Sequence, residues 1–114
     1  MTRQTNASLV LVTCGGLAEA RRIAKAVVAK RWAACVNLVS APVESVYRWK
    51  GQVEQAKEFL LIIKTTKRRL KELQKEIARL HSYDVPEFLV IGVESGSRKY
   101  LDWLAENVGE KVRK

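Results

Sequence analysis

The sequence PVESVYRWKGQVEQAKEFLLIIKTT, residues 42–66, decides the fold of this chain. Its first part alternates between two faces and is rich in aromatic and β-branched residues, which is typical of a β-strand. Lys50-Gly51 then offers a tight turn of two residues, or of three with a glycine bulge, because glycine tolerates the left-handed conformation. The continuous apolar run at 59–63 is typical of a strand covered on both faces. The stretch therefore predicts a β-hairpin.

The predicted hairpin is long for a chain of this size. From Val53 to Thr65 the second strand would extend about 43 Å at ~3.3 Å per residue, whereas a compact domain of this length measures ~35 Å across. The polar tip should therefore project beyond the domain and expose the edges of its strands. Such edges either pair with another subunit or are protected by charged side chains, here Glu54, Lys57 and Glu58. The residues alone leave both interpretations open.

Length and composition indicate one small globular domain. The chain has 114 residues, 47% of them hydrophobic and 29% charged, and we expect an ordered core of about residues 8–108. No apolar run approaches the ~18 residues of a membrane span. The start of the chain is short and polar without an apolar signal region, so we expect a cytoplasmic protein with no membrane partner. Cys14 and Cys35 are too few for a disulfide framework.

The net charge of +9 makes nucleic acid the first partner to consider. The basic residues fall mainly in two segments, 19–31 and 67–79, each with a net charge of +4. We interpret this charge as spread over helix surfaces, without aromatic residues on which bases could stack. An RNA-recognition domain would also carry an aromatic motif on a central strand, where this chain has Leu60-Leu61-Ile62-Ile63. We therefore expect no specific nucleic-acid partner.

Periodicity along the rest of the chain predicts the order of its elements. Strands are expected at 9–12, 33–39 and 88–93, and helices at 17–31, 66–81 and 98–108. Thr66 is the expected N-cap of the second helix, and Tyr100 is expected on the inward face of the third.

These elements predict an α+β fold, the ferredoxin-like split βαβ sandwich, with a long central hairpin and an added C-terminal helix. Right-handed crossovers place the first two helices on one face of an antiparallel sheet. The apolar strands imply that the other face is covered as well, and other subunits are the obvious source of that cover.

Several motifs in this order resemble those of one protein family. They are the segments Ala33–Asn37, Tyr47–Gly51, Leu61–Thr65, His81–Glu87 and Tyr100–Trp103. Together they make the chain, from about Leu9 to Val108, similar to the divalent-cation tolerance proteins, the CutA family. The resemblance implies a ferredoxin-like fold, a tight homotrimer built through the long hairpins, and a role in the response to copper and other divalent metal ions.

The resemblance does not carry a copper site over to this chain. Some members have proposed copper ligands at the positions of Val12, Leu80 and His81, and only the histidine is present here. Members usually have proline where Ser82 stands. These departures leave His81 without the companions that it has in such members.

His81 is the only histidine, and one imidazole alone makes a poor copper or zinc site. Cys14, Cys35 and Glu87 are the candidate companions that folding or a neighbouring subunit could bring to it. The residues imply no certain cofactor, and the candidate is Cu(II) or another divalent metal. We expect any such binding to be weak or to involve two subunits.

A second set of residues carries polar or charged groups in or beside the strands. Its members are Tyr47, Trp49, Lys64, Tyr83, Glu87, Tyr100 and Trp103. In the family many of these positions gather at a cleft between subunits, which makes them candidates for ligand binding. The alternative, slightly preferred, is that the aromatic residues pack the trimer interface, as they commonly do. Lys64 is the candidate partner for the carboxylate of Glu87.

The leading interpretation is a trimeric divalent-cation (copper) tolerance protein. The first alternative is a trimeric regulator that senses a small ligand in its intersubunit clefts, which rests on fold analogy. The second is a nucleic-acid-binding module, suggested by the charge. No serine–histidine–acid set, pair of catalytic acids or nucleotide loop can be identified, so we expect no enzyme and name no catalytic residues.

Overall fold

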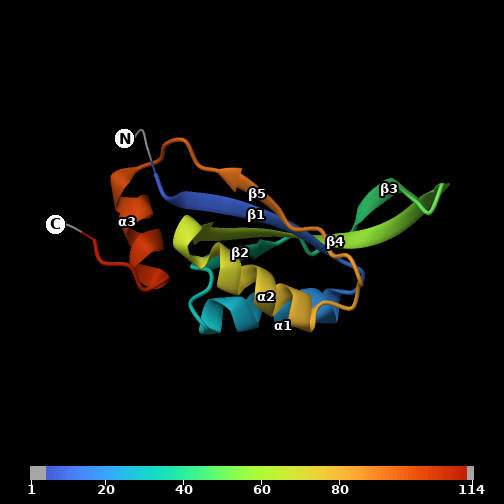
Figure 1. The fold of residues 1–114 in the computed structure, drawn as a ribbon, viewed down its shortest axis with the longest axis horizontal. Coiled ribbons are helices and arrows are strands. Elements are labelled where there is room, and N and C mark those ends of the chain that lie inside the picture. Colours follow the sequence, from blue (N-terminus) through green and yellow to red (C-terminus); the bar gives the residue numbers. More distant parts are fainter. Residues whose placement is uncertain (1–4, 113–114) are drawn as a thin grey trace.

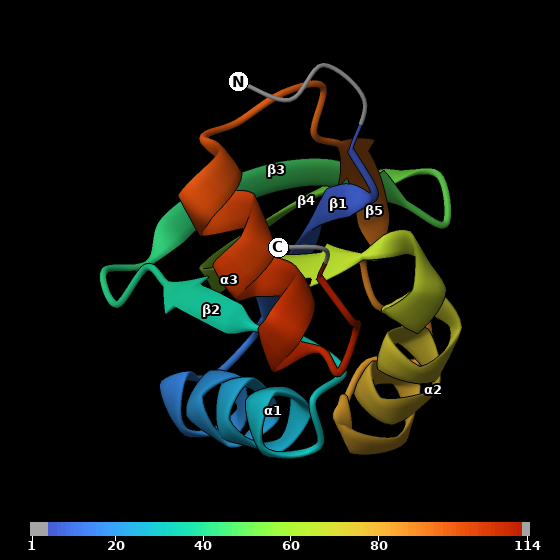
Figure 2. The same ribbon diagram turned by 90° about the vertical axis from the view of Figure 1, so that its left-hand side faces the viewer.

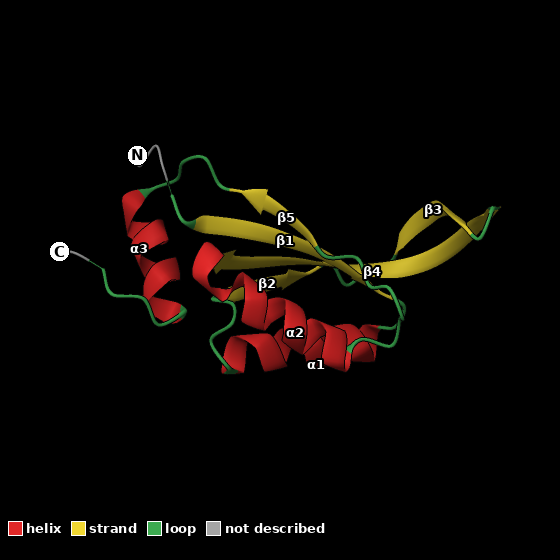
Figure 3. Cartoon of the chain, in the orientation of Figure 1, coloured by secondary structure: helices red, strands yellow, loops and turns green. Residues whose placement is uncertain are grey.

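The computed structural model describes residues 5–112, and residues 1–4 and 113–114 lie outside the described part. Within residues 5–112, five strands and three helices follow one another (Figures 1 and 3). They are β1 (Ala7–Cys14), α1 (Leu17–Ala29), β2 (Cys35–Leu38), β3 (Val43–Trp49), β4 (Gln52–Thr66), α2 (Leu70–Leu80), β5 (Leu89–Gly92) and α3 (Arg98–Asn107). A 3-10 turn at Lys67–Arg69 precedes α2. The predicted order of elements is therefore confirmed.

The sheet is antiparallel and has the order β2-β4-β1-β5, with β3 paired to the outer part of β4. Helices α1 and α2 lie side by side on one face of this sheet, and α3 crosses one end of it (Figures 1 and 2). This arrangement is the predicted split βαβ sandwich with an added C-terminal helix.

Strand β4 belongs to both the sheet and the hairpin. Its residues 59–66 pair with β1, and its residues 52–58 pair with β3. Lys50 and Gly51 both have positive φ, 50° and 80°, so the hairpin closes with a turn of two residues. The molecule measures 52 × 26 × 24 Å, because the hairpin projects beyond the sheet as its length predicts (Figure 1).

The core lies between the sheet and the two helices. The alternation in β1 and β4 sends one row of side chains toward the helices, where Val10, Val12, Leu61 and Ile63 are buried. The helices complete this cluster with the residues Ala20, Ile23, Val27, Leu73 and Ile77. The side chains on the edge strand β5 remain exposed, with Leu89, Val90 and Ile91 open to solvent.

Two local predictions are wrong. Thr66 does not cap α2, because β4 continues to Thr66 opposite Ala7, and the Lys67 N–H donates to the Asn6 carbonyl instead. The Thr66 hydroxyl donates to a Glu110 carboxylate oxygen. Tyr100 does not face inward; it is exposed on α3, while Leu104 takes the buried position.

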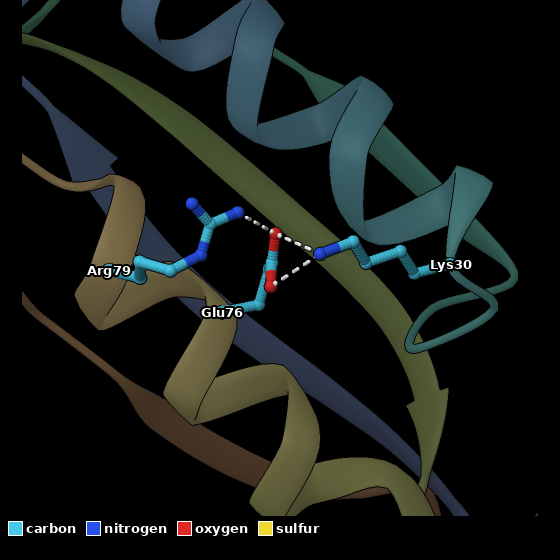
Figure 4. Close-up of polar contacts among 3 residues, drawn as sticks. All are labelled: Lys30, Glu76 and Arg79. Atoms are coloured by element: carbon cyan, nitrogen blue, oxygen red, sulfur yellow. Dashed lines mark hydrogen bonds and ion pairs between the residues drawn. The ribbon is translucent and has the colours of Figure 1, made fainter.

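A carboxylate joins the two helices. Glu76 of α2 is buried between Lys30, at the C-cap of α1, and Arg79 on its own helix (Figure 4). The hydrogen bond from Arg79, with a further contribution from Lys30, lowers the pKa of Glu76 against the opposing effect of burial. Glu76 therefore stays ionised and ties the helices together.

Candidate functional site

The candidate site lies where β1, α1 and α2 meet at one end of the sheet. Cys14 is the last residue of β1, Glu19 lies in the first turn of α1, and His81 is the C-cap of α2. One potential ligand atom from each residue lies within 4.8 Å of the others. The fold thus joins two residues predicted as metal ligands, Cys14 and His81, with a third that the sequence did not indicate.

The hydrogen bonds of His81 fix its tautomer. Its Nε2 lies 2.7 Å from the carbonyl oxygen of Thr13, which can only accept a hydrogen bond. Its Nδ1 accepts from the Tyr83 N–H at 3.1 Å. The imidazole therefore carries its proton on Nε2 and is neutral in this arrangement. A metal ion could reach the lone pair of Nδ1 only by displacing the Tyr83 N–H.

Glu19 supplies an acceptor atom that the protein leaves unused. Its Oε2 accepts from the Ser82 N–H at 3.0 Å. Its Oε1 is buried, lies 3.8 Å from His81 Nδ1, and has no hydrogen-bond partner within the described residues. A buried carboxylate oxygen without a partner is costly, and a cation between Glu19 and His81 would remove that cost.

Cys14 contributes a sulfur atom to the same space. Its side chain is buried, and burial, with smaller effects from Glu19 and Glu58, raises the pKa of the thiol to about 12. The thiol is thus protonated at neutral pH and is no free nucleophile. A metal ion that bound Cys14 would have to displace that proton.

A tyrosine and a second carboxylate adjoin this group. The hydroxyl of Tyr83 donates to Glu58 Oε2 at 2.8 Å, and its ring lies 4.7 Å from that of His81. Burial and the bond to Glu58 raise the pKa of Tyr83. Gly15 makes room for this contact, because a Cβ there would lie 3.0 Å from the Tyr83 hydroxyl oxygen.

Glu87 has a different neighbour from the one predicted. Burial, followed by the charge of Glu58, raises the pKa of Glu87. Lys64 does not partner it; the Lys64 ammonium lies 3.3 Å from the hydroxyl of Tyr100 and over that ring. Glu87 thus lies beside another carboxylate, outside the group of Cys14, Glu19 and His81.

Within one chain the other candidates do not form a single group: Tyr47 lies close enough to Tyr83 to contribute to its raised pKa, whereas Lys64 and Trp103 gather around Tyr100. Cys35 lies on β2 opposite Lys64 and outside the metal-ligand group. Trp103 packs on Tyr100 of the same helix, with ring centroids 5.4 Å apart. Tyr47 and Trp49 lie exposed on the projecting hairpin. A single ligand site for the whole predicted set would therefore need residues from more than one subunit.

The sequence contains weak signals for the two residues that were missed. Glu19 is the only acidic residue of α1, and at the first turn of a helix a carboxylate is usually explained by the helix dipole. Glu58 directly precedes the apolar run of β4 and was assigned to edge protection, yet it is buried. The position of Glu58 at the border of an apolar strand was the signal that could have indicated its burial.

The chemistry of the group suits a borderline metal ion. A thiol, an imidazole and a carboxylate together match the donors that zinc and copper use in proteins. Two features oppose metal binding. His81 Nδ1 would have to give up its hydrogen bond from the Tyr83 N–H, and the thiol of Cys14 would have to lose its proton. The geometry is therefore that of a weak site.

Comparisons with known proteins agree on one family. The family model described as CutA1 divalent ion tolerance protein matches residues 8–107. The divalent-cation tolerance protein CutA of Thermus thermophilus is 46% identical over 101 residues, which cover 89% of this chain and 97% of that protein. Human protein CutA is 40% identical over 108 residues, which cover 92% of this chain and 60% of that protein.

Solved structures agree with the sequence comparison. The divalent cation tolerance protein Cut A1 from Thermus thermophilus has a TM-score of 0.88 at 45% identity, with 90% of this chain and 99% of that chain covered. A structure described as the periplasmic divalent cation tolerance protein CutA from Archaeoglobus fulgidus has a TM-score of 0.86 at 38% identity, with 90% and 98% covered. These matches lend no support to a small-ligand regulator or a nucleic-acid-binding module as the function.

Among the described residues, no helix has the length and apolar character to cross a membrane.

Proposed function

Because the chain belongs to the CutA1 family of divalent ion tolerance proteins, we propose that it binds a divalent cation weakly and acts as a homotrimer. The binding site in this proposal consists of Cys14, Glu19 and His81. The observation that carries it is the buried Oε1 of Glu19, which has no hydrogen-bond partner within the described residues and lies 3.8 Å from His81 Nδ1.

The proposed ligands set the class of cation. Sulfur and imidazole nitrogen favour Zn(II) or copper over Mg²⁺ or Ca²⁺, which prefer oxygen. In this proposal Glu19 offers an atom already free, His81 turns Nδ1 from Tyr83 to the ion, and Cys14 gives up its proton. Cys35 and Glu87, the other predicted ligands, would take part only through a neighbouring subunit.

Calorimetric titration of the purified chain with Zn(II) tests this site, with Cu(II) as a second ion and a chelator as reversal control. We expect saturable binding that Cys14→Ser and Glu19→Gln each weaken about tenfold or more, the range seen when supporting or direct ligands are removed. Cys35→Ser is the matched control, because it removes the other thiol, and it should bind as the parent does. Unchanged binding in both the Cys14 and Glu19 variants would refute this site.

Apolar side chains that are exposed when the chain is considered alone support the proposed trimer. Several of them lie on the projecting hairpin and on the edge strand β5, where the most exposed are Val46, Trp49, Val53, Leu89 and Ile91. Exposed edges with apolar side chains are places where chains associate, and a closed ring would leave no free edge.

Light scattering coupled to size exclusion tests the assembly. The parent should run at three times its chain mass of 12.9 kDa, and Trp49→Asp should shift it toward monomer. Gln52→Asp is the matched control, since Gln52 is exposed and pairs with Trp49 across the hairpin, and the change adds the same charge without removing an apolar side chain. A monomeric parent, or equal mass for the parent and the Trp49 variant, would contradict the hairpin interface.

We also propose a cytoplasmic location and no catalytic role. The only histidine has a backbone carbonyl and a backbone N–H as partners, and neither is a nucleophile. Fractionation of cells that produce the chain would test the location.

A further inference from the structure

The fold gathers most of the positive charge of the chain on one surface. The segments 17–31 and 67–80 contain eleven basic and three acidic residues, which gives +8 of the net charge of +9. Their helices α1 and α2 form one layer on the same face of the sheet (Figure 2). The charge thus lies on helix surfaces as interpreted, and the two segments, remote in sequence, form a single basic layer.

The basic layer is exposed and almost free of counter-charges. Its exposed basic residues are Arg21, Arg22, Lys25, Lys30, Arg31, Lys67, Arg68, Lys71, Lys75 and Arg79. Its three acidic residues are already engaged within the described part of the chain. Glu19 accepts from Ser82, Glu72 pairs with Arg69, and Glu76 pairs with Lys30 and Arg79. Eight of the ten exposed cations thus make no ion pair among the described residues.

Contacts at both ends hold the basic layer together. Lys30 at the end of α1 binds Glu76 of α2, and Glu19 at the start of α1 accepts from Ser82 just after α2. The two rows of cations therefore keep a fixed relative position, which lowers the entropy cost of binding an extended anion. Repulsion among the unpaired cations is relieved when such an anion is bound.

We propose that the basic layer docks on the phosphate backbone of duplex nucleic acid without reading its sequence. Lysine and arginine contacts to phosphate supply affinity but no base recognition. The layer lacks the aromatic platforms that single strands require, since neither segment contains Phe, Tyr or Trp. The adjoining Trp32 is half-buried, with the Arg69 guanidinium 5.7 Å above its ring.

The same layer is poorly suited to a lipid surface. Amphipathic helices bind membranes by burying an apolar face among the lipids, and the apolar faces of α1 and α2 are buried against the sheet. Val28 is the only large hydrophobic residue exposed on these two helices.

The proposed docking surface does not read a nucleic-acid sequence. The proposal depends on neither the proposed metal site nor the proposed trimer.

Fluorescence anisotropy with a labelled duplex tests the proposal on the full chain. A mixed-sequence DNA of roughly 20 base pairs should bind, and log Kd should depend linearly on log salt between about 50 and 200 mM NaCl. The layer variant combines Arg22→Gln, Lys25→Gln, Lys71→Gln and Lys75→Gln. It should weaken binding about tenfold or more, and the salt slope should fall by ~0.9 for each phosphate that the variant no longer neutralises.

A charge-matched control separates the layer from net charge. It combines Lys50→Gln, Arg98→Gln, Lys99→Gln and Lys111→Gln, four exposed residues outside the layer, and should bind within about threefold of the parent. Circular dichroism confirms that both variants fold.

Four results would overturn the proposal. They are equal losses of affinity in the two variants, absence of duplex binding at about 50 mM NaCl, tighter binding to poly-dT than to the duplex, and binding to vesicles of anionic phospholipid without binding to the duplex. Similar affinity for a second duplex of unrelated sequence supports docking without readout, and a large difference between the two contradicts it.

Discussion

Both carboxylate oxygens of Glu76 lie 3.1 Å from the Nζ atom of Lys30, so α2 holds the residue at the end of α1. The side chain of Glu76 is 8% exposed, whereas that of Lys30 is 49% exposed. The anion is thus the enclosed partner and the cation the exposed one. Loss of Glu76 should therefore matter more to stability than an ordinary surface ion pair.

Glu76→Gln should lower the free energy of unfolding by about 1.5–3 kcal/mol at neutral pH, the usual value of hydrogen bonds to a charged group. Glu72→Gln is the control, because Glu72 is 37% exposed and its Arg69 contact is 3.6 Å long, so its effect should stay below ~0.5 kcal/mol. Denaturant unfolding measures both. Equal effects would contradict the assigned role of Glu76.

The same pair predicts a pH dependence. The folded pKa of Glu76 lies below its ordinary value of 4.5, so its stabilisation is complete above that value and is lost as the pH falls through the folded pKa. The difference in stability between the parent and Glu76→Gln should therefore shrink under acid conditions. A series of melting curves from neutral pH downward measures it, and a constant difference would contradict the ionised state assigned to Glu76.

Gly15→Ala should destabilise the candidate site. The added Cβ would lie 3.0 Å from the hydroxyl oxygen of Tyr83, which is held by Glu58. Tyr83 must shift or lose that bond, at a cost of about 1 kcal/mol. Gly16→Ala is the matched control because a Cβ there meets nothing within 4 Å. Thermal melts and the near-ultraviolet circular dichroism of tyrosine report the difference.

Ser8→Ala should stabilise the protein. The Ser8 hydroxyl oxygen is buried and has no hydrogen-bond partner within the described residues, which costs about 1 kcal/mol or more. Its neighbour across the ladder, Thr65, donates to the Trp32 carbonyl at 2.7 Å. Thr65→Val should therefore destabilise by about 1 kcal/mol. Denaturant unfolding should therefore show a gain in stability for Ser8→Ala and a loss for Thr65→Val. A loss of stability in Ser8→Ala would show that the Ser8 hydroxyl has a partner.

Glu87→Gln should raise the melting temperature at neutral pH. Burial and the charge of Glu58 raise the folded pKa of Glu87 above 4.5, so its ionisation costs stability as the pH rises through that range. The gain should vanish below pH ~4, where the carboxyl is protonated in both states. Melting curves at several pH values measure it, and a gain independent of pH would point to packing as its cause.

Much of the fold could be predicted because its signals are local. The alternation in 43–49 and the stripe of Leu70, Leu73 and Ile77 reflect backbone periods that sequence spacing records directly. The Thr66 cap was mispredicted because a distant segment decided the outcome. Ala7 pairs with Thr66 and extends β4 past the expected boundary, and capping preference yields to such tertiary bonds.

The candidate site could be predicted only in part, because its members come from segments far apart. Cys14 and His81 were identifiable as rare ligand types. Glu19 joins them only because α1 begins beside the end of α2, a relation that no local pattern records. The basic layer is different, because both helices were expected on one face of the sheet and the joining of their basic segments follows from that placement.

The continuity of β4 has a mechanical consequence. One strand runs from Gln52 to Thr66 without interruption, so no flexible joint separates the projecting arm from the body. A hinge would need a few residues that are free to change φ and ψ. At the root of the arm, the residues of β4 up to 58 pair with β3, and those from 59 onward pair with β1. The arm therefore has no joint of its own, and a force applied at its tip is transmitted to the hydrogen-bonded ladder between β4 and β1.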